Sequence, residues 1–211
     1  MSPKLKVEGA YKPLNEYDPL VDTEIARACV RELQSKYLDQ VGRIQRFEGA
    51  GVYALYYGGQ HELYAPLNMS LFEEPRYQLP IYVGRALPVG SRKGLVDESA
   101  SPLFNRLQEH LTSITFAEDL DEDKFLARYL VLKPMWIEAV ERFLIEHYQP
   151  VWNCALEGFG SKAPGSIRKN TAKSQWDTLH PGRPWATEQQ PARSRESIAR
   201  NVRAHIAEHR L

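Results

Sequence analysis

One predicted helix of the 211-residue chain carries ionisable side chains at a spacing suited to phosphate chemistry. Ser101-Pro102 is a strong helix start, with serine as the N-cap and proline at the first helical position. In the helix that follows, Arg106 and His110 lie four residues apart and share a face at the edge of the apolar stripe. Such a pair can bind a phosphate group. The alternative, a surface arginine beside a half-buried histidine, is favoured by this helix taken alone.

A second predicted helix, opened by Pro134, carries a carboxylate on its apolar face. The residues that share this face with Glu141 are Ile137, Leu144, Ile145 and Tyr148. Burying an unpaired carboxylate is costly, so Glu141 needs a cation, either an arginine or a metal ion such as Mg²⁺. These residues leave both alternatives open. Asn153, shortly after this helix, either bridges backbone groups near the site or forms a turn, which is the more common role.

Two short predicted strands each place a tyrosine beside a glycine. The first carries Gly51-Val52-Tyr53 and the second carries Tyr82-Val83-Gly84. Glycine permits a close approach of neighbouring backbone. Buried tyrosine hydroxyls usually serve the core, so this pattern alone is weak evidence for a site.

The elements that must position these side chains follow from hydrophobic periodicity, caps and turn residues. We predict helices over residues 23–39, 102–113, 134–148 and 195–209, and strands over 52–57, 81–83 and 125–132. Loops are predicted over 60–79 and 87–101, and an irregular segment over 156–193. This order indicates an α/β (α+β) fold, in which a small mixed or antiparallel three-stranded sheet is flanked by helices.

Together these motifs resemble the signature of the GIY-YIG nuclease family. The two tyrosine–glycine triplets have valine where the family has isoleucine, Arg106 and His110 match its Arg-x-x-x-His/Tyr helix, and Glu141 and Asn153 match its Glu…Pro-x-x-Asn element. The four motifs stand in the family's order over residues 49–153. The resemblance implies the GIY-YIG fold and hydrolysis of a DNA phosphodiester bond.

The resemblance also assigns roles to the motif residues. The implied catalytic residues are Tyr53, Tyr82, Arg106, His110, Glu141 and Asn153. Glu141 would bind Mg²⁺, one ion per active site, and Arg106 would stabilise charge on the phosphoryl oxygens. The general base is either Tyr53, with a nearby cation favouring its phenolate, or His110. Tyr82 would orient the water or Tyr53, and Asn153 would brace the site.

The zero net charge hides an asymmetry between two parts of the chain. Residues 161–211 hold 10 basic and 4 acidic side chains, whereas residues 1–160 hold 17 and 23. A basic C-terminal quarter indicates a polyanionic partner, here double-stranded DNA. The candidate DNA contacts are Arg85, Arg92, Lys93, Lys162, Arg168, Lys169, Lys173 and Arg183.

Residues 158–162 and 176–185 resemble the tail of GIY-YIG type II restriction endonucleases that cut CCGCGG. This resemblance implies site-specific double-strand cleavage at a GC-rich palindrome, a two-fold symmetric homodimer and a companion DNA methyltransferase. We expect three parts of the chain. They are an N-terminal helical extension that forms a dimer or DNA arm (1–48), a nuclease core (49–155), and a basic DNA-contacting segment with a terminal helix (156–211).

Composition excludes several other classes. The longest run without charge, residues 49–61, is too short to span a bilayer, and the N-terminus has no signal-like apolar stretch. We therefore expect a cytoplasmic protein with no membrane partner. Cys29 and Cys154 are the only cysteines, which excludes a disulfide scaffold and, because no Cys/His cluster is expected, structural zinc.

Three alternatives have to be weighed against this interpretation. Many restriction enzymes use an Asp…Glu-x-Lys core, which Asp97 with Glu122 and Lys124 would fit by pattern. A repair or homing nuclease is a second possibility within the same family. The third is a non-catalytic DNA-binding protein on a GIY-YIG fold.

Overall fold

The computed structural model describes residues 23–68, 79–88, 99–161 and 172–209, of which 23–26 and 68 are described by backbone alone. The helices are α1 (Thr23–Gln34), α2 (Ala65–Asn68), α3 (Pro102–Thr115), α4 (Pro134–Tyr148), α5 (Val151–Cys154), α6 (Gln175–Leu179) and α7 (Arg195–Glu208). The strands are β1 (Asp39–Gln40), β2 (Gly51–Tyr57), β3 (Tyr82–Ala86) and β4 (Phe125–Val131). Short 3₁₀ turns are η1 (Val41–Arg43), η5 (Glu122–Lys124) and η7 (Pro184–Ala186).

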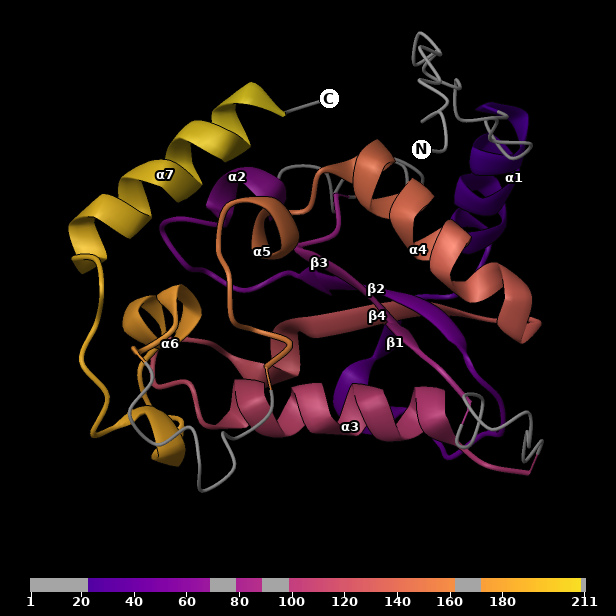
Figure 1. Cartoon of the computed structure of the whole chain (residues 1–211), viewed down its shortest axis with the longest axis horizontal. Coiled ribbons are helices and arrows are strands. Elements are labelled where there is room, and N and C mark those ends of the chain that lie inside the picture. The colour runs from indigo at the N-terminus through magenta and orange to yellow at the C-terminus, as the bar shows by residue number, and fades with distance from the viewer. Residues whose placement is uncertain (1–22, 69–78, 89–98, 162–171, 210–211) are drawn as a thin grey trace, which may run out of the picture.

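The strands form one antiparallel sheet in the order β1-β4-β2-β3 (Figure 1). β2 is central and pairs with β3 on one side and β4 on the other. The first glycine of β2, Gly51, has no room for a side chain, because a Cβ there would collide with the carbonyl oxygen of Leu130 in β4. This close approach explains the glycine at the start of the strand.

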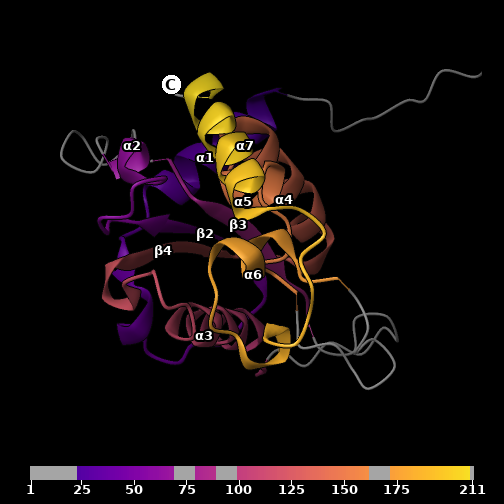
Figure 2. The same ribbon diagram turned by 90° about the vertical axis from the view of Figure 1, so that its left-hand side faces the viewer.

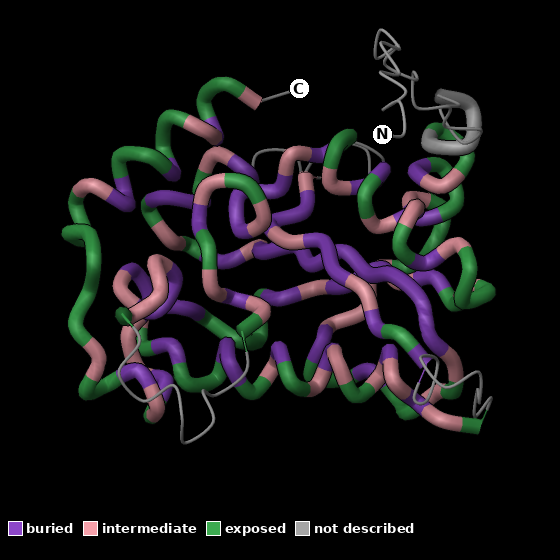
Figure 3. Tube along the Cα trace, in the orientation of Figure 1, coloured by how far each residue is buried: buried purple, intermediate pink, exposed green. Residues whose placement is uncertain are grey.

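Helices cover both faces of the sheet, as Figures 1 and 2 show, with α3 on one face and α1 and α4 on the other. Every residue of β2 is buried (Figure 3). Side chains alternate along a strand, so Tyr53 and Leu55 join the core on the α3 face, whereas Val52 and Ala54 join the core beneath α1 and α4. A strand covered on both faces reads as a continuous apolar run, as residues 52–57 do.

The structure confirms the predicted fold class and most of the predicted elements. It corrects several bounds: the strand predicted over 81–83 is Tyr82–Ala86, and the loop predicted over 60–79 contains α2. The helix predicted over 23–39 ends at Gln34, and Asp39 and Gln40 instead pair with Ala127 and Leu126 of β4 as a fourth, edge strand. Tyr37, which lies within the predicted range of this helix, is outside α1 and 88% exposed. Local periodicity could not reveal this pairing because its partner lies nearly 90 residues away.

The segment predicted to be irregular, 156–193, contains the short helices α6 and η7 within its described part. Ser174 caps α6 by accepting a hydrogen bond from the Asp177 backbone N–H. Helix α7 covers α5 and α6 and places Ile198, Val202 and Ile206 in the core. Among the described residues, none of the helices combines the length and apolarity needed for a membrane span.

Candidate active site

Tyr53 of β2 and His110 of α3 form the centre of the site. The Tyr53 hydroxyl lies 2.5 Å from His110 Nε2, and both residues are at most 2% exposed. Tyr53 stands opposite Gly84 of β3, where a Cβ would collide with the Tyr53 hydroxyl. The second tyrosine–glycine triplet therefore needs its glycine to leave room for the first tyrosine.

Tyr82 and Arg106 complete this group from β3 and α3. The Tyr82 ring lies 6.2 Å from the Tyr53 ring and 5.3 Å from the His110 ring, measured between centroids. The Arg106 guanidinium lies near enough to both tyrosine hydroxyls to act toward lowering their pKa values, and it donates to Glu109 Oε2 at 2.7 Å. The fold thus gathers the four predicted residues of the two strands and α3 into one cluster.

Glu141 of α4 meets an arginine in the described structure. Arg85 Nη1 donates to Glu141 Oε2 at 2.6 Å, and a second carboxylate, Glu138, lies 3.5 Å from the same nitrogen. The Glu141 side chain is 18% exposed and lies near enough to both tyrosines to raise their pKa values. Arg85, predicted to contact DNA, therefore lies beside Glu141, one of the predicted catalytic residues.

Asn153 braces the second tyrosine strand. Its Oδ1 accepts from the Val83 backbone N–H and its Nδ2 donates to the Val83 carbonyl oxygen, both at 2.8 Å. The residue lies in α5, which begins at Val151 after Pro150, and not in a simple turn. Because Val83 lies between Tyr82 and Gly84, this side chain fixes the strand next to the site.

Burial dominates the electrostatics of the central pair. It raises the pKa of Tyr53 well above 10, with a further contribution from Tyr82, and Arg106 offsets this only partly. The expectation that a nearby cation favours the phenolate is therefore not met in this state. Burial, aided by Arg106 and Arg183, lowers the pKa of His110 well below 6.5. Tyr53 is accordingly protonated and His110 neutral at physiological pH.

Glu141 also shows the effect of burial. Desolvation raises the pKa of this carboxyl above its usual value, although Arg85 opposes the shift. A buried carboxylate of this kind gains from any cation placed beside it. Of the two alternatives left open by the sequence, the described state shows the arginine pair, and the same oxygens are suitable ligands for a divalent ion.

The segment that follows α5 closes over the site with Phe159 and Gly160. Neither residue was predicted to take part in catalysis. The Phe159 ring stacks on His110 at 4.5 Å between centroids, with an interplanar angle of 16°. The Gly160 carbonyl accepts from Arg106 Nη2 at 2.7 Å. A Cβ at Gly160 would come within 2.7 Å of the Tyr82 hydroxyl. The Gly-Phe-Gly sequence, already part of the tail resemblance, was the available signal for this role.

Arg183 was predicted to contact DNA, but the structure buries it. It is 1% exposed, and its Nε pairs with Asp177 Oδ1 at 2.5 Å. Its other nitrogens donate to the Gly158 and Phe159 carbonyls, and it stacks over the Trp176 ring at 4.3 Å. The guanidinium thus holds the segment that closes the site, and it has no free surface to offer a phosphate backbone.

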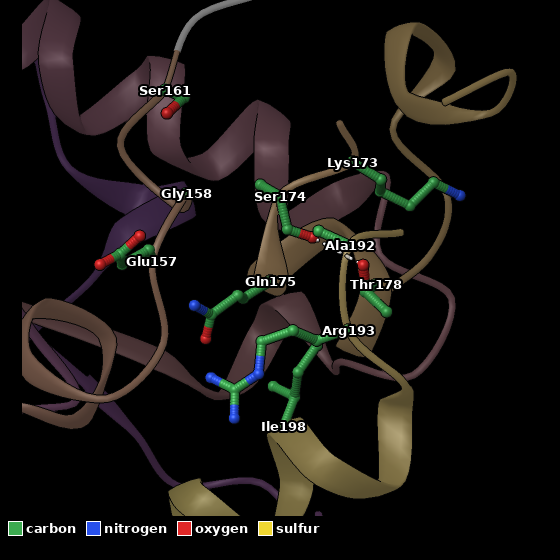
Figure 4. Close-up of a pocket in the computed structure, with 10 residues that line it drawn as sticks. All are labelled: Glu157, Gly158, Ser161, Lys173, Ser174, Gln175, Thr178, Ala192, Arg193 and Ile198. Carbon is green, nitrogen blue, oxygen red and sulfur yellow. Dashed lines mark hydrogen bonds between the residues drawn. The ribbon is translucent and has the colours of Figure 1, made fainter. Parts of the chain in front are cut away.

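Of the other predicted DNA contacts, Lys173 is half-buried and lines a pocket of about 340 Å³ (Figure 4). Arg193 projects into this pocket opposite Glu157. None of the six predicted catalytic residues lines it. Five predicted contacts lie outside the described residues: Arg92, Lys93, Lys162, Arg168 and Lys169.

The alternative Asp…Glu-x-Lys core receives no support from the described residues. Asp97 lies outside them. Glu122 and Lys124 are exposed on the turn η5, where Glu122 accepts a hydrogen bond from the Thr115 hydroxyl. Neither side chain is held against the tyrosine cluster by any hydrogen bond or ion pair among the described contacts.

The site combines two tyrosines on adjacent antiparallel strands with an Arg/His helix and a glutamate helix. This arrangement is consistent with the resemblance to GIY-YIG nucleases. The family model described as the Eco29kI GIY-YIG domain matches residues 45–209, which is most of the chain. The chain therefore belongs to this family of GIY-YIG restriction endonucleases. A search of curated proteins gives no match.

Proposed function

We propose that this protein is a type II restriction endonuclease that cuts both DNA strands at a GC-rich palindrome, CCGCGG, with Mg²⁺ as cofactor. The observation that carries the proposal is the buried Tyr53–His110 contact, which lies beside Arg106 and near the carboxylate of Glu141. A DNA-binding protein without catalysis has no need of this arrangement. The CCGCGG site rests on the tail resemblance, and the homodimer and companion methyltransferase follow from the palindrome and the family.

The proposed reaction begins with proton transfer through the central pair. Tyr53 donates its proton to the neutral His110 Nε2 and its oxygen takes a proton from the attacking water in the same step. We assign this order because His110 is only 2% exposed and its ring packs against the rings of Phe159, Tyr82 and Tyr53. Positioned acid–base groups of this kind contribute a rate factor of about 10²–10⁴.

Arg106 is the proposed stabiliser of the phosphoryl oxygens. Its side chain is 21% exposed and is held by Glu109 and the Gly160 carbonyl, so its position is fixed before DNA arrives. Fixed donors stabilise developing charge without reorganisation, and removal of one typically costs a factor of about 10²–10³ in rate. Tyr82 and Asn153 keep Tyr53 and β3 in place.

Glu141 fits a magnesium site because it supplies a partly exposed carboxylate that already holds a cation, Arg85. Mg²⁺ is commonly held by one or two carboxylates together with water and substrate phosphates. When bound, the ion would polarise the phosphate and stabilise the leaving 3′-oxygen. Arg85, whose side chain is 32% exposed, would then leave Glu141 and pair with a DNA phosphate.

The test is digestion of unmethylated plasmid DNA with Mg²⁺, followed by sequencing of the ends. Wild type should give discrete fragments that end in one GC palindrome, and Glu141→Ala should not cut. Glu146→Ala, an exposed carboxylate on the same helix, is the matched control and should cut normally. A smear would refute site specificity. Retardation of DNA in a gel without cleavage would instead support the alternative of a DNA-binding protein. Loss of cutting in Glu122→Ala, with cutting kept in Glu141→Ala, would support the Asp…Glu-x-Lys core.

A further inference from the structure

His61, Asp119 and His180 meet in a second cluster of metal-ligating groups. They come from the segment before α2, the loop after α3 and the C-terminal end of α6. His180 Nδ1 lies 2.9 Å from Asp119 Oδ1, and His61 Nε2 lies 3.5 Å from Asp119 Oδ2. One ligand atom from each residue lies within 4.8 Å of the other two. The sequence analysis considered only Cys/His patterns, so it did not predict this His/Asp cluster, whose members are far apart in the chain.

We propose that this cluster binds a divalent transition-metal ion, best exemplified by Zn²⁺, at a site separate from Glu141. Zn²⁺ bonds of about 2.0–2.2 Å in a tetrahedron place ligand atoms about 3.4 Å apart. The two histidine–aspartate distances are close to this value, but they end on different oxygens of Asp119. With one oxygen as the ligand atom, no pair of ligand atoms has to approach by more than about 1.4 Å. Two imidazoles and one carboxylate, with water as the fourth ligand, are a recognised zinc donor set.

The surroundings of His180 suit a ligand. The side chain has no solvent-exposed surface, and its Nδ1 faces the Asp119 carboxylate. Its other nitrogen, Nε2, lies 2.6 Å from the Tyr64 hydroxyl, which also accepts from Trp152 Nε1 at 2.9 Å. Ligating histidines are usually oriented by such a contact at the second nitrogen.

Access is provided by the other two ligands, whose side chains are 10% (His61) and 24% (Asp119) exposed. Two contacts must be given up on binding. Arg195 Nη2 lies 3.1 Å from Asp119 Oδ2, and the Leu63 N–H lies 3.3 Å from His61 Nδ1. The arginine side chain is 53% exposed, so it can turn into solvent. We therefore expect removal of this charge to strengthen metal binding about two- to fivefold, the range typical of an exposed ion pair.

The site would tie the C-terminal segment to the nuclease core. Between ring centroids, His180 lies 5.8 Å from Trp152, and Trp152 lies 4.4 Å from Phe159. The Phe159 ring in turn stacks on His110. A metal ion at His180 would therefore stabilise the segment that closes over the active site. This inference does not depend on the proposed cleavage specificity or on Mg²⁺ at Glu141.

The test uses the full-length protein and two probes, Co²⁺ and Zn²⁺, without DNA. We expect one equivalent of Co²⁺ to give the intense visible absorption of a four-coordinate ion and one equivalent of Zn²⁺ to abolish it. His61→Ala should weaken binding by about 100-fold or more, whereas Glu141→Ala should leave it unchanged. Arg195→Gln should tighten it. Far-UV circular dichroism without metal checks folding, and Asp119→Asn replaces His61→Ala if that variant is unfolded.

Three results would overturn the proposal. The first is wild-type protein that binds neither ion with micromolar or better affinity. The second is an octahedral Co²⁺ spectrum that persists in His61→Ala. The third is binding that disappears in Glu141→Ala, which would move the ion to the active site.

Discussion

The Tyr53–His110 contact can be tested as a unit by a double-mutant cycle with Tyr53→Phe and His110→Phe. Both residues are buried and the hydroxyl lies 2.5 Å from Nε2. Tyr53→Phe leaves that nitrogen without this partner, and an unsatisfied buried polar group costs about 1–3 kcal/mol. Phenylalanine at position 110 preserves the stack on Phe159. The double variant removes both polar groups, so we expect the two destabilisations to be non-additive by about 1–3 kcal/mol in urea unfolding.

The same variants should also show that Tyr53 and His110 act together in catalysis. If Tyr53 passes its proton to His110, either substitution alone should lower the single-turnover cleavage rate by about 10²–10⁴. The double variant should then be little slower than the worse single variant, because groups that act together are not additive. Single-turnover rates measured on a short duplex containing the target site supply the comparison.

Two outcomes would refute this reasoning. If His110→Phe kept nearly the full rate while Tyr53→Phe lost it, His110 would not be the proton acceptor. If the stability effects were additive within about 0.5 kcal/mol, the short contact would contribute no coupling. Circular dichroism of all four proteins controls for a change of fold.

Three further predictions follow from the neighbouring contacts. Asn153→Leu should lower the free energy of unfolding by about 2–4 kcal/mol in urea titration, since two β3 backbone groups lose their partner; a change below 0.5 kcal/mol would show that water replaces it. Arg85→Gln should raise Mn²⁺ affinity in the absence of DNA, measured by calorimetry, while slowing cleavage; unchanged affinity would mean that the pair with Glu141 does not compete with metal. Below pH 6.5 His110 is protonated in the unfolded chain but not in the folded protein, so the free energy of unfolding should fall by up to about 1.4 kcal/mol for each pH unit of acidification. The variant His110→Phe should flatten that part of the stability–pH profile. Equal slopes in wild type and variant would contradict the depressed pKa.

Local patterns in the sequence were sufficient for the elements that carry the site. The prolines at 102 and 134 opened α3 and α4 at the predicted residues, and helical spacing placed Arg106 and His110 on one face. The tyrosine–glycine triplets fell on strands because each short apolar run is bounded by turn residues. Information of this kind lies within a few residues, so it is readable without the fold.

The distribution of charge was a weaker guide. Arg183 and Arg85 count equally with surface lysines in the composition, but one is buried against Asp177 and the other pairs with Glu141. Nothing in the neighbouring sequence distinguishes these roles. The acidic partner of Arg85 lies 56 residues away, and its proximity is created by the packing of α4 on β3.

The sequence by itself predicted the candidate catalytic groups, through the family resemblance, and the helices and strands that carry them, because those elements depend on local conformational preference. Only the tertiary structure decided the state of those groups. Burial between the sheet and α3 keeps Tyr53 protonated and His110 neutral, and chain closure over long separations adds β1 and brings His61 and Asp119 to His180. Desolvation and distant contacts arise from packing, which no short stretch of sequence contains.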